Sequence, residues 1–136
     1  MDEIMENTTT PCTAAGEKNR IELMDVSKDP ASLVWTPHAS FRGVFLQHLI
    51  TGSETGRRMS IHHVRIDPGC AIGGHTHAGM VEVHDVLAGS GTCTLDKKEI
   101  TYVPGTLGVM PADTLHRIDA GAEGMLLLAT FSPPLV

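Results

Sequence analysis

Short stretches in which apolar and polar residues alternate follow one another from Ser32 to the end of the chain. β-Branched and aliphatic residues dominate these stretches, and Gly, Pro, Asp and Ser separate them. This pattern is typical of half-buried strands in a β-sandwich or β-barrel, and no segment has the sustained periodicity of a long helix. It predicts strands over residues 32–35, 41–50, 59–66, 81–87, 92–95, 100–103, 107–110, 116–118 and 125–131.

The first 25 residues lack this alternation and are mostly polar. We interpret residues 1–25 as an N-terminal arm with one short strand near Ile21–Met24, and residues 26–136 as a single β-barrel domain. A chain of 136 residues is long enough for one core and too short for two independent ones.

Composition and charge exclude several classes of partner. The net charge is −6, and Lys and Arg occur at most in pairs, so the chain has no basic patch for nucleic acid. The longest late apolar run, Met125–Ala129, is too short to span a bilayer. The acidic start and three irregularly spaced cysteines favour a cytoplasmic protein without disulfides.

Histidines gather in the middle of the chain, where the candidate chemistry lies. His75 and His77 are two residues apart, so both rings would share one face of an extended strand. Glu82 follows five residues after His77, and the intervening Ala78-Gly79 is a plausible break that turns its side chain back to the same point. His116 would arrive from a third strand. Three imidazoles and one carboxylate suit a divalent ion of Fe, Mn, Ni, Zn, Co or Cu.

The spacing of these residues resembles the two motifs of the cupin family. The first is Gly69, five residues, His75-x-His77, four residues, Glu82, six residues and Gly89. The second is Gly105, five residues, Pro111 and then His116. The resemblance extends over about residues 41–134 and implies a double-stranded β-helix (jelly-roll) barrel.

By this resemblance, the metal ligands would be His75, His77, Glu82 and His116. The second motif departs from the family pattern at Asp113, where a glycine is usual, and at Ala120, where an asparagine is usual. Neither position is a ligand, so the departures affect the expected local turn and the rim of the barrel.

Several further residues are candidates for a role beside the metal. His84 lies two residues after Glu82 and should face inward with it, as a general acid/base, as a hydrogen-bond partner of a ligand, or merely as a ring that fills the barrel. One of His62 and His63 should face inward, and the sequence leaves open which. Three arginines would bind a carboxylate if they lined the mouth of the barrel: Arg42, Arg65 and Arg117.

Two functions remain open at this point. The first is a metal-dependent enzyme acting on a small organic molecule, of the dioxygenase, isomerase or lyase type. The second is a non-catalytic module that binds a metal or a small ligand. The family resemblance also implies a homodimer, in which the N-terminal arm would extend the sheet of the partner.

Overall fold

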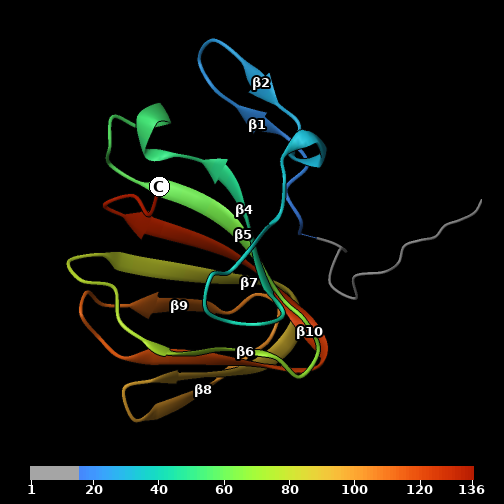
Figure 1. The fold of residues 1–136 in the computed structure, drawn as a ribbon, viewed down its shortest axis with the longest axis vertical. Helices are drawn as coiled ribbons and strands as arrows, with labels where there is room; N and C mark the ends of the chain where they lie inside the picture. The colour runs from blue at the N-terminus through green and yellow to red at the C-terminus, as the bar shows by residue number, and fades with distance from the viewer. Residues whose placement is uncertain (1–15) are drawn as a thin grey trace, which may run out of the picture.

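The computed structural model describes residues 16–136, which form a β-barrel with two single-turn helices (Figure 1). The remaining 15 residues of the predicted arm lie outside the described part. The strands are β1 (Ile21–Glu22), β2 (Ser27–Lys28), β3 (Thr36–Pro37), β4 (Val44–Ile50), β5 (Ser60–Ile66), β6 (Ala71–His75), β7 (Val81–Leu95), β8 (Lys98–Tyr102), β9 (Leu107–Met110) and β10 (His116–Ser132). The 3₁₀ helices are η1 (Pro30–Ser32) and η2 (Gly52–Glu54). No helix within residues 16–136 is long and apolar enough to cross a membrane.

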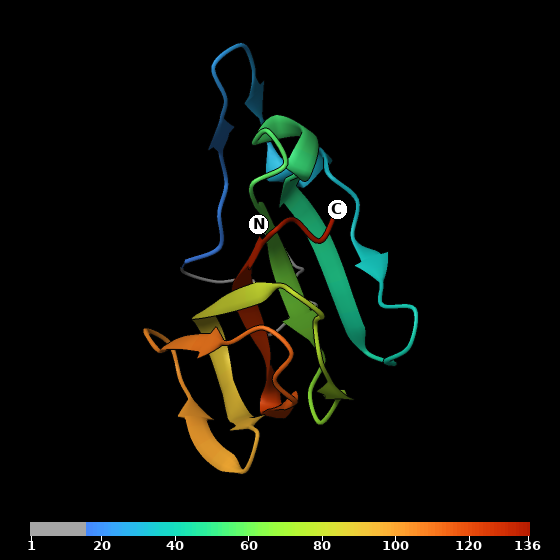
Figure 2. The same cartoon turned by 90° about the vertical axis from the view of Figure 1, so that its left-hand side faces the viewer.

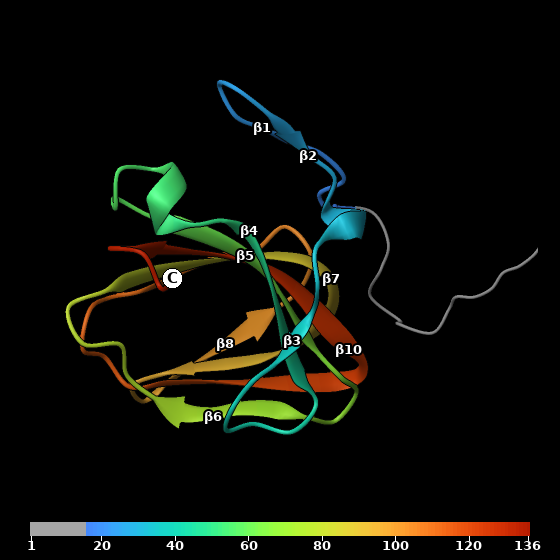
Figure 3. The same ribbon diagram turned by 45° about the horizontal axis from the view of Figure 1, so that its top comes forward.

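Two long antiparallel strands, β7 and β10, form the frame of the barrel. The second half of β10 pairs with β5 and with the first half of β7, which also pairs with β9. The first half of β10 pairs with β6 and with the second half of β7, which also pairs with β8. The barrel therefore has β4 and β5 on one side and β6 on the opposite side (Figure 3). This arrangement is the expected all-β jelly-roll barrel.

Glycines allow the two long strands to pass from one side of the barrel to the other. A Cβ atom on Gly91 would lie 2.1 Å from the carbonyl oxygen of Asp119, and one on Gly89 would lie 2.0 Å from that of Gly124. Gly89 and Gly124 also have positive φ angles of 74° and 75°. The β7–β10 register shifts between Ala120 and Met125, close to these contacts. The barrel thus turns its corner where two backbones approach too closely for side chains.

Three predictions about the number of strands were wrong. Residues 81–87 and 92–95 belong to one strand, β7, because the glycines between them bend the strand without ending it. Residues 116–118 and 125–131 are likewise both part of β10. Residues 32–35 do not form a strand: η1 ends at Ser32, after the side chain of Asp29 caps its first turn.

The segment before the barrel forms a hairpin that projects from it (Figure 2). The predicted short strand is present as β1, and its partner β2 lies beyond residue 25, so the hairpin straddles the predicted domain boundary. A buried histidine fastens the start of this segment to the outer face of the barrel. His63 Nε2 accepts the backbone N–H of Lys18 at 3.0 Å, and His63 Nδ1 donates to Gln47 Oε1 at 2.9 Å.

This contact should make the fold sensitive to acid. Burial, aided by the nearby charge of Lys18, lowers the pKa of His63 from 6.5 to about 4, so the unfolded chain binds more protons between these pH values. The contribution of neutral His63 to the free energy of unfolding should therefore be fully present above pH 6.5. It should be lost as the pH falls toward 4, which lowers the free energy of unfolding by roughly 1–3 kcal/mol. Urea unfolding at pH 7 and pH 4.5 measures the loss. A His63→Gln variant should show a shallower dependence on pH, and an identical dependence would contradict the assignment.

Candidate metal centre

Four side chains from three strands and one turn converge at one point inside the barrel. One donor atom from each of His75, His77, Glu82 and His116 lies within 4.8 Å of the others. Metal–donor bonds of about 2.0–2.2 Å place two donors of one ion roughly 3–4.4 Å apart, so shifts of a few tenths of an ångström would satisfy an ion here. The structure therefore brings together all four residues that the sequence analysis selected.

The two histidines of the first motif reach this point in different ways. His75 ends β6, and its Nδ1 donates to the carbonyl oxygen of Gly73 at 2.7 Å, which leaves Nε2 as the free acceptor. His77 lies two residues beyond the end of the strand, so the expectation of one continuous strand through both was wrong. Their Nε2 atoms are nevertheless 3.1 Å apart.

Asp113 holds the turn that carries His77. Its backbone N–H donates to the carbonyl oxygen of His77 at 3.1 Å, and its Oδ1 accepts the N–H of Gly79 at 3.1 Å. Asp113 adopts a positive φ of 63°, a conformation that glycine takes easily and Asp tolerates better than most residues. The departure from the motif at this position therefore keeps the turn and adds a side-chain hydrogen bond between two loops.

Glu82 is the second residue of β7 and is 6% exposed. Its Oε2 lies 2.9 Å from His84 Nε2, and His84 Nδ1 lies 2.9 Å from the hydroxyl of Tyr102. The prediction that His84 faces inward with Glu82 is confirmed. Both of its ring nitrogens have partners, so His84 orients the carboxylate. Sequence reasoning missed Tyr102. Its hydroxyl oxygen lies 2.0 Å from where a Cβ atom on Gly108 would be, so it occupies space that only a glycine at position 108 leaves open.

His116 begins β10 and completes the cluster. Its Nδ1 donates to the carbonyl oxygen of Thr114 at 3.0 Å, so its Nε2 also points into the site as an acceptor. Glu82 Oε1 and His116 Nε2 are 3.2 Å apart, yet neither makes an aligned hydrogen bond within the described part of the chain. Buried polar atoms are rarely left without a partner. These two orphaned atoms, beside a neutral imidazole pair, fit the donor set of a transition-metal ion.

The protonation states of three of the four side chains suit a cation. Burial lowers the pKa of both His75 and His77, so their rings are neutral and can donate lone pairs. Burial raises the pKa of Glu82, but the adjoining His116 and His84 lower it by more than burial raises it. The net pKa lies below the usual value, and the carboxylate is ionised. Burial likewise lowers the pKa of His116, whereas the Glu82 carboxylate and the Thr114 carbonyl bring it above the usual value.

A small cavity of about 80 Å³ opens onto three of these four residues. Its walls are mainly apolar, and its lining comprises His38, Val44, Leu46, Val64, Ile72, His75, His77, Glu82, Phe131 and Leu135. The arginines that would bind a carboxylate at the mouth of the barrel do not belong to this lining. Arg65 lies over the Phe45 ring on the outer face, Arg117 pairs with Asp119, and neither they nor Arg42 reach this lining.

His38 is a polar residue of this lining that the sequence analysis missed. It precedes β4, outside both motifs, and no spacing rule connects it to the metal ligands. Of the two adjacent histidines, His62 faces the interior, where its ring centroid lies 5.6 Å from that of Phe131. His63 faces outward, where its ring stacks on that of Trp35. Cys93 is fully buried, and its thiol donates to Met110 Sδ at 3.9 Å.

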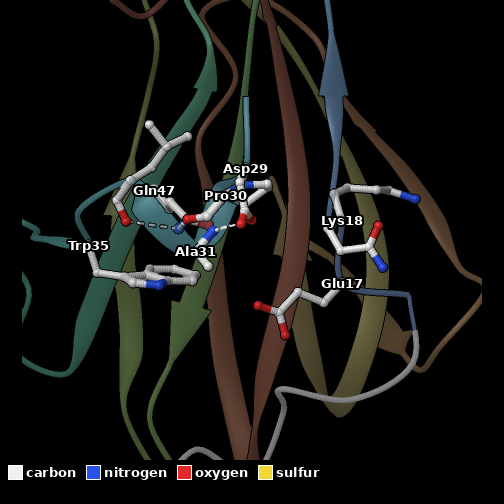
Figure 4. A pocket seen from close by; sticks show the side chains of 9 residues that line it. Glu17, Lys18, Asp29, Pro30, Ala31, Trp35 and Gln47 are labelled. Carbon is white, nitrogen blue, oxygen red and sulfur yellow. Dashed lines mark hydrogen bonds between the residues drawn. The ribbon is translucent and has the colours of Figure 1, made fainter. Parts of the chain in front are cut away.

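A larger hollow of about 320 Å³ lies elsewhere, on the outer face of the barrel (Figure 4). Residues of the N-terminal segment and of η1 line it, and the Trp35 ring and the Glu17 carboxylate face each other across it. Gln47, whose side chain donates to the carbonyl oxygens of Pro30 and Leu33, closes its floor. None of the four clustered residues takes part, so this hollow is separate from the candidate metal centre.

Comparison with solved structures shows the same fold in proteins of varied roles. A predicted oxalate decarboxylase from Thermotoga maritima matches at 20% identity over 76% of this chain and 96% of its own, with a TM-score of 0.68. The polyketide cyclase RemF from Streptomyces resistomycificus matches at 15% identity over 78% and 77%, with a TM-score of 0.68. An RmlC-like cupin from Shewanella frigidimarina matches at 18% identity over 85% and 95%, also at 0.68.

Identities this low establish the fold and leave the activity open. No curated protein sequence matches the chain significantly. The sequence profile of the cupin domain matches residues 62–131, which is just over half of the chain and includes all four clustered residues. The barrel, the two motifs and this match agree, and the chain belongs to the cupin domain family.

Proposed function

We propose that this protein is a metal-dependent enzyme that acts on a small organic molecule. The observation that carries the proposal is the buried, orphaned pair of donor atoms, Glu82 Oε1 and His116 Nε2, within a cluster that borders a cavity. Four protein ligands leave two positions open on a six-coordinate ion, which is the arrangement a catalytic site needs.

A divalent ion held by His75, His77, Glu82 and His116 would supply Lewis-acid or redox chemistry to a bound oxygen donor. The chain itself contributes the positioning. The carbonyl oxygens of Gly73 and Thr114 fix two imidazoles in the tautomer that binds metal through Nε2. Leu135 and Phe131 give the cavity wall an apolar surface beside the site.

We assign His84 a positioning role in this enzyme. Its Nε2 contacts the Glu82 oxygen that lies farther from the other ligands, and its Nδ1 contacts Tyr102, so the imidazole holds the carboxylate in one orientation. Partners of this kind typically change metal affinity or activity by about 10–100-fold when removed. A general acid or base would instead need a ring nitrogen free to reach the substrate.

The second candidate function is a binding module in which the metal only holds a ligand or stabilises the barrel. The small size of the cavity, about 80 Å³, favours this alternative, because little room remains for a reacting pair of molecules. The two functions differ in whether a bound molecule is converted.

The test is a turnover screen of the full chain loaded separately with Fe²⁺, Mn²⁺, Co²⁺, Ni²⁺, Cu²⁺ and Zn²⁺. Small hydroxy, oxo and dicarboxylic acids are incubated with each form, and products are followed by NMR together with oxygen consumption. We expect turnover with at least one metal, its loss in His75→Ala, and a reduced but measurable rate in His84→Phe. Metal-loaded protein that binds these acids and converts none of them would favour the binding module. Full activity in His84→Phe would remove the role assigned to His84.

A further inference from the structure

The cavity beside the metal cluster combines an apolar wall with a low content of charge. Five aliphatic side chains and the Phe131 ring line it, together with His38 and three of the metal-binding residues. No Lys or Arg belongs to this lining among residues 16–136. The proposed ion would carry two positive charges, of which Glu82 neutralises one while the imidazoles remain neutral. One positive charge is then left to compensate a ligand.

This balance limits the charge of what can bind. A ligand with one negative charge makes the site neutral, whereas a ligand with two leaves an uncompensated charge among apolar side chains. Burying such a charge costs several kcal/mol unless a partner is present. Arg65 and Arg117, which would have supplied a partner, instead lie over the Phe45 ring and pair with Asp119, respectively, and Arg42 is not part of the lining.

His38 supplies the cavity with a hydrogen-bond donor. Its Nδ1 accepts the backbone N–H of Ser40 at 3.0 Å, so in the neutral ring the proton is on Nε2. Burial lowers the pKa of His38, which keeps the ring neutral. The residue is held in place by its backbone N–H, which donates to the carbonyl oxygen of Val44 at 2.8 Å, and by the Phe41 ring at 4.8 Å.

We propose that the site takes a small oxygen-donor ligand with an apolar body and at most one negative charge, and that His38 Nε2–H hydrogen-bonds this ligand. The inference rests on the proposed metal site and goes beyond it, because it names the class of molecule and a residue that selects it. The aliphatic residues Val44, Leu46 and Val64 would contact the apolar body.

The experiment uses Co²⁺-loaded protein and three 2-hydroxycarboxylates that share one metal-binding group. Glycolate has no substituent on its 2-carbon, 2-hydroxy-3-methylbutanoate has an isopropyl group there, and malate has a second carboxylate. Binding is followed by the visible absorption of cobalt and by calorimetry. We expect 2-hydroxy-3-methylbutanoate to bind at least about 10-fold more tightly than glycolate, since three more carbon atoms are buried. Malate should bind more weakly than 2-hydroxy-3-methylbutanoate by a similar factor.

Variants separate the two parts of the inference. His38→Phe should weaken glycolate and 2-hydroxy-3-methylbutanoate equally, by about 10-fold or more, and His38→Gln should restore part of the affinity because it keeps a donor. Val64→Thr, nearly equal in volume, should weaken only 2-hydroxy-3-methylbutanoate. Cobalt content should be unchanged in all three variants.

The outcomes distinguish this inference from the proposed function. Equal affinity for malate and 2-hydroxy-3-methylbutanoate, or no effect of His38→Phe on cobalt-loaded protein, would overturn the inference and leave the metal site intact. Failure of the wild-type chain to bind cobalt, or equal cobalt binding by His75→Ala, would overturn the metal site and the inference with it.

Discussion

A His116→Ala variant purified without chelator should contain less than about a tenth of the metal found in the wild-type chain. His116 Nε2 is buried, has no aligned hydrogen-bond partner in the described structure, and lies 3.2 Å from the only carboxylate in the cluster. Removal of this side chain should therefore lower the metal affinity by more than the 10–100-fold typical of residues that only support a ligand. Elemental analysis of both proteins measures the difference, with the wild type expected near one equivalent per chain.

A matched control is available in the same barrel. His48 is a partly buried histidine whose Nδ1 faces His62 Nδ1 at 2.8 Å, outside the four-residue cluster. His48→Ala should keep the wild-type metal content. Circular dichroism and urea unfolding of the metal-free proteins establish that His116→Ala still folds. A folded His116→Ala chain with a full equivalent of metal would refute the proposed ligand set.

A Gly91→Ala substitution should destabilise the barrel by about 3 kcal/mol or more. The added methyl group would lie 2.1 Å from the carbonyl oxygen of Asp119, 2.7 Å from Met125 Sδ and 3.1 Å from the Cα of Ala120. Two of these atoms belong to the backbone of β10, which pairs with β7 on both sides of the corner and cannot move without breaking that pairing. The free energy of unfolding in urea gives the effect directly.

Gly74→Ala provides the comparison for this substitution. A Cβ on Gly74 meets only Leu115 Cδ1, at an ordinary contact distance of 3.5 Å. We expect a change of about 1 kcal/mol or less for Gly74→Ala in the metal-free protein. Similar decreases in the free energy of unfolding for both variants would show that the close approach of β7 and β10 is not the reason why position 91 requires glycine.

The clustered residues were predictable because three of the four lie at strand ends, and the motifs specify the spacing of all four. His75 ends β6, Glu82 follows the first residue of β7, and His116 begins β10. A motif that records the distance between such ends records which side chains meet. It does not require each local inference to hold, and His77 reaches the site although it lies in a turn instead of on the expected strand.

Other features depend on packing that a pattern of residue types does not contain. A glycine between two apolar stretches is compatible with a turn between two strands and also with a bend within one strand. The pattern therefore predicts two strands where β7 is one, and two where β10 is one. The choice between His62 and His63 depends on which face of β5 covers the interior, and both turn out to be fully buried. His38 belongs to no motif, and only the fold places it beside the cavity.

The donor set is held by hydrogen bonds that need no ion: the backbone carbonyls behind His75 and His116 fix two rings, and the Asp113 side chain fixes the turn that carries His77. An arriving ion therefore meets ligands that are already aimed, and the chain has little rearrangement to complete. The speed of loading would then follow how readily each ion sheds its own water, with Zn²⁺ entering quickly and Ni²⁺ slowly. A rigid site of this kind accepts whichever suitable ion reaches it first, and the occupant in a cell would reflect local supply more than the shape of the barrel.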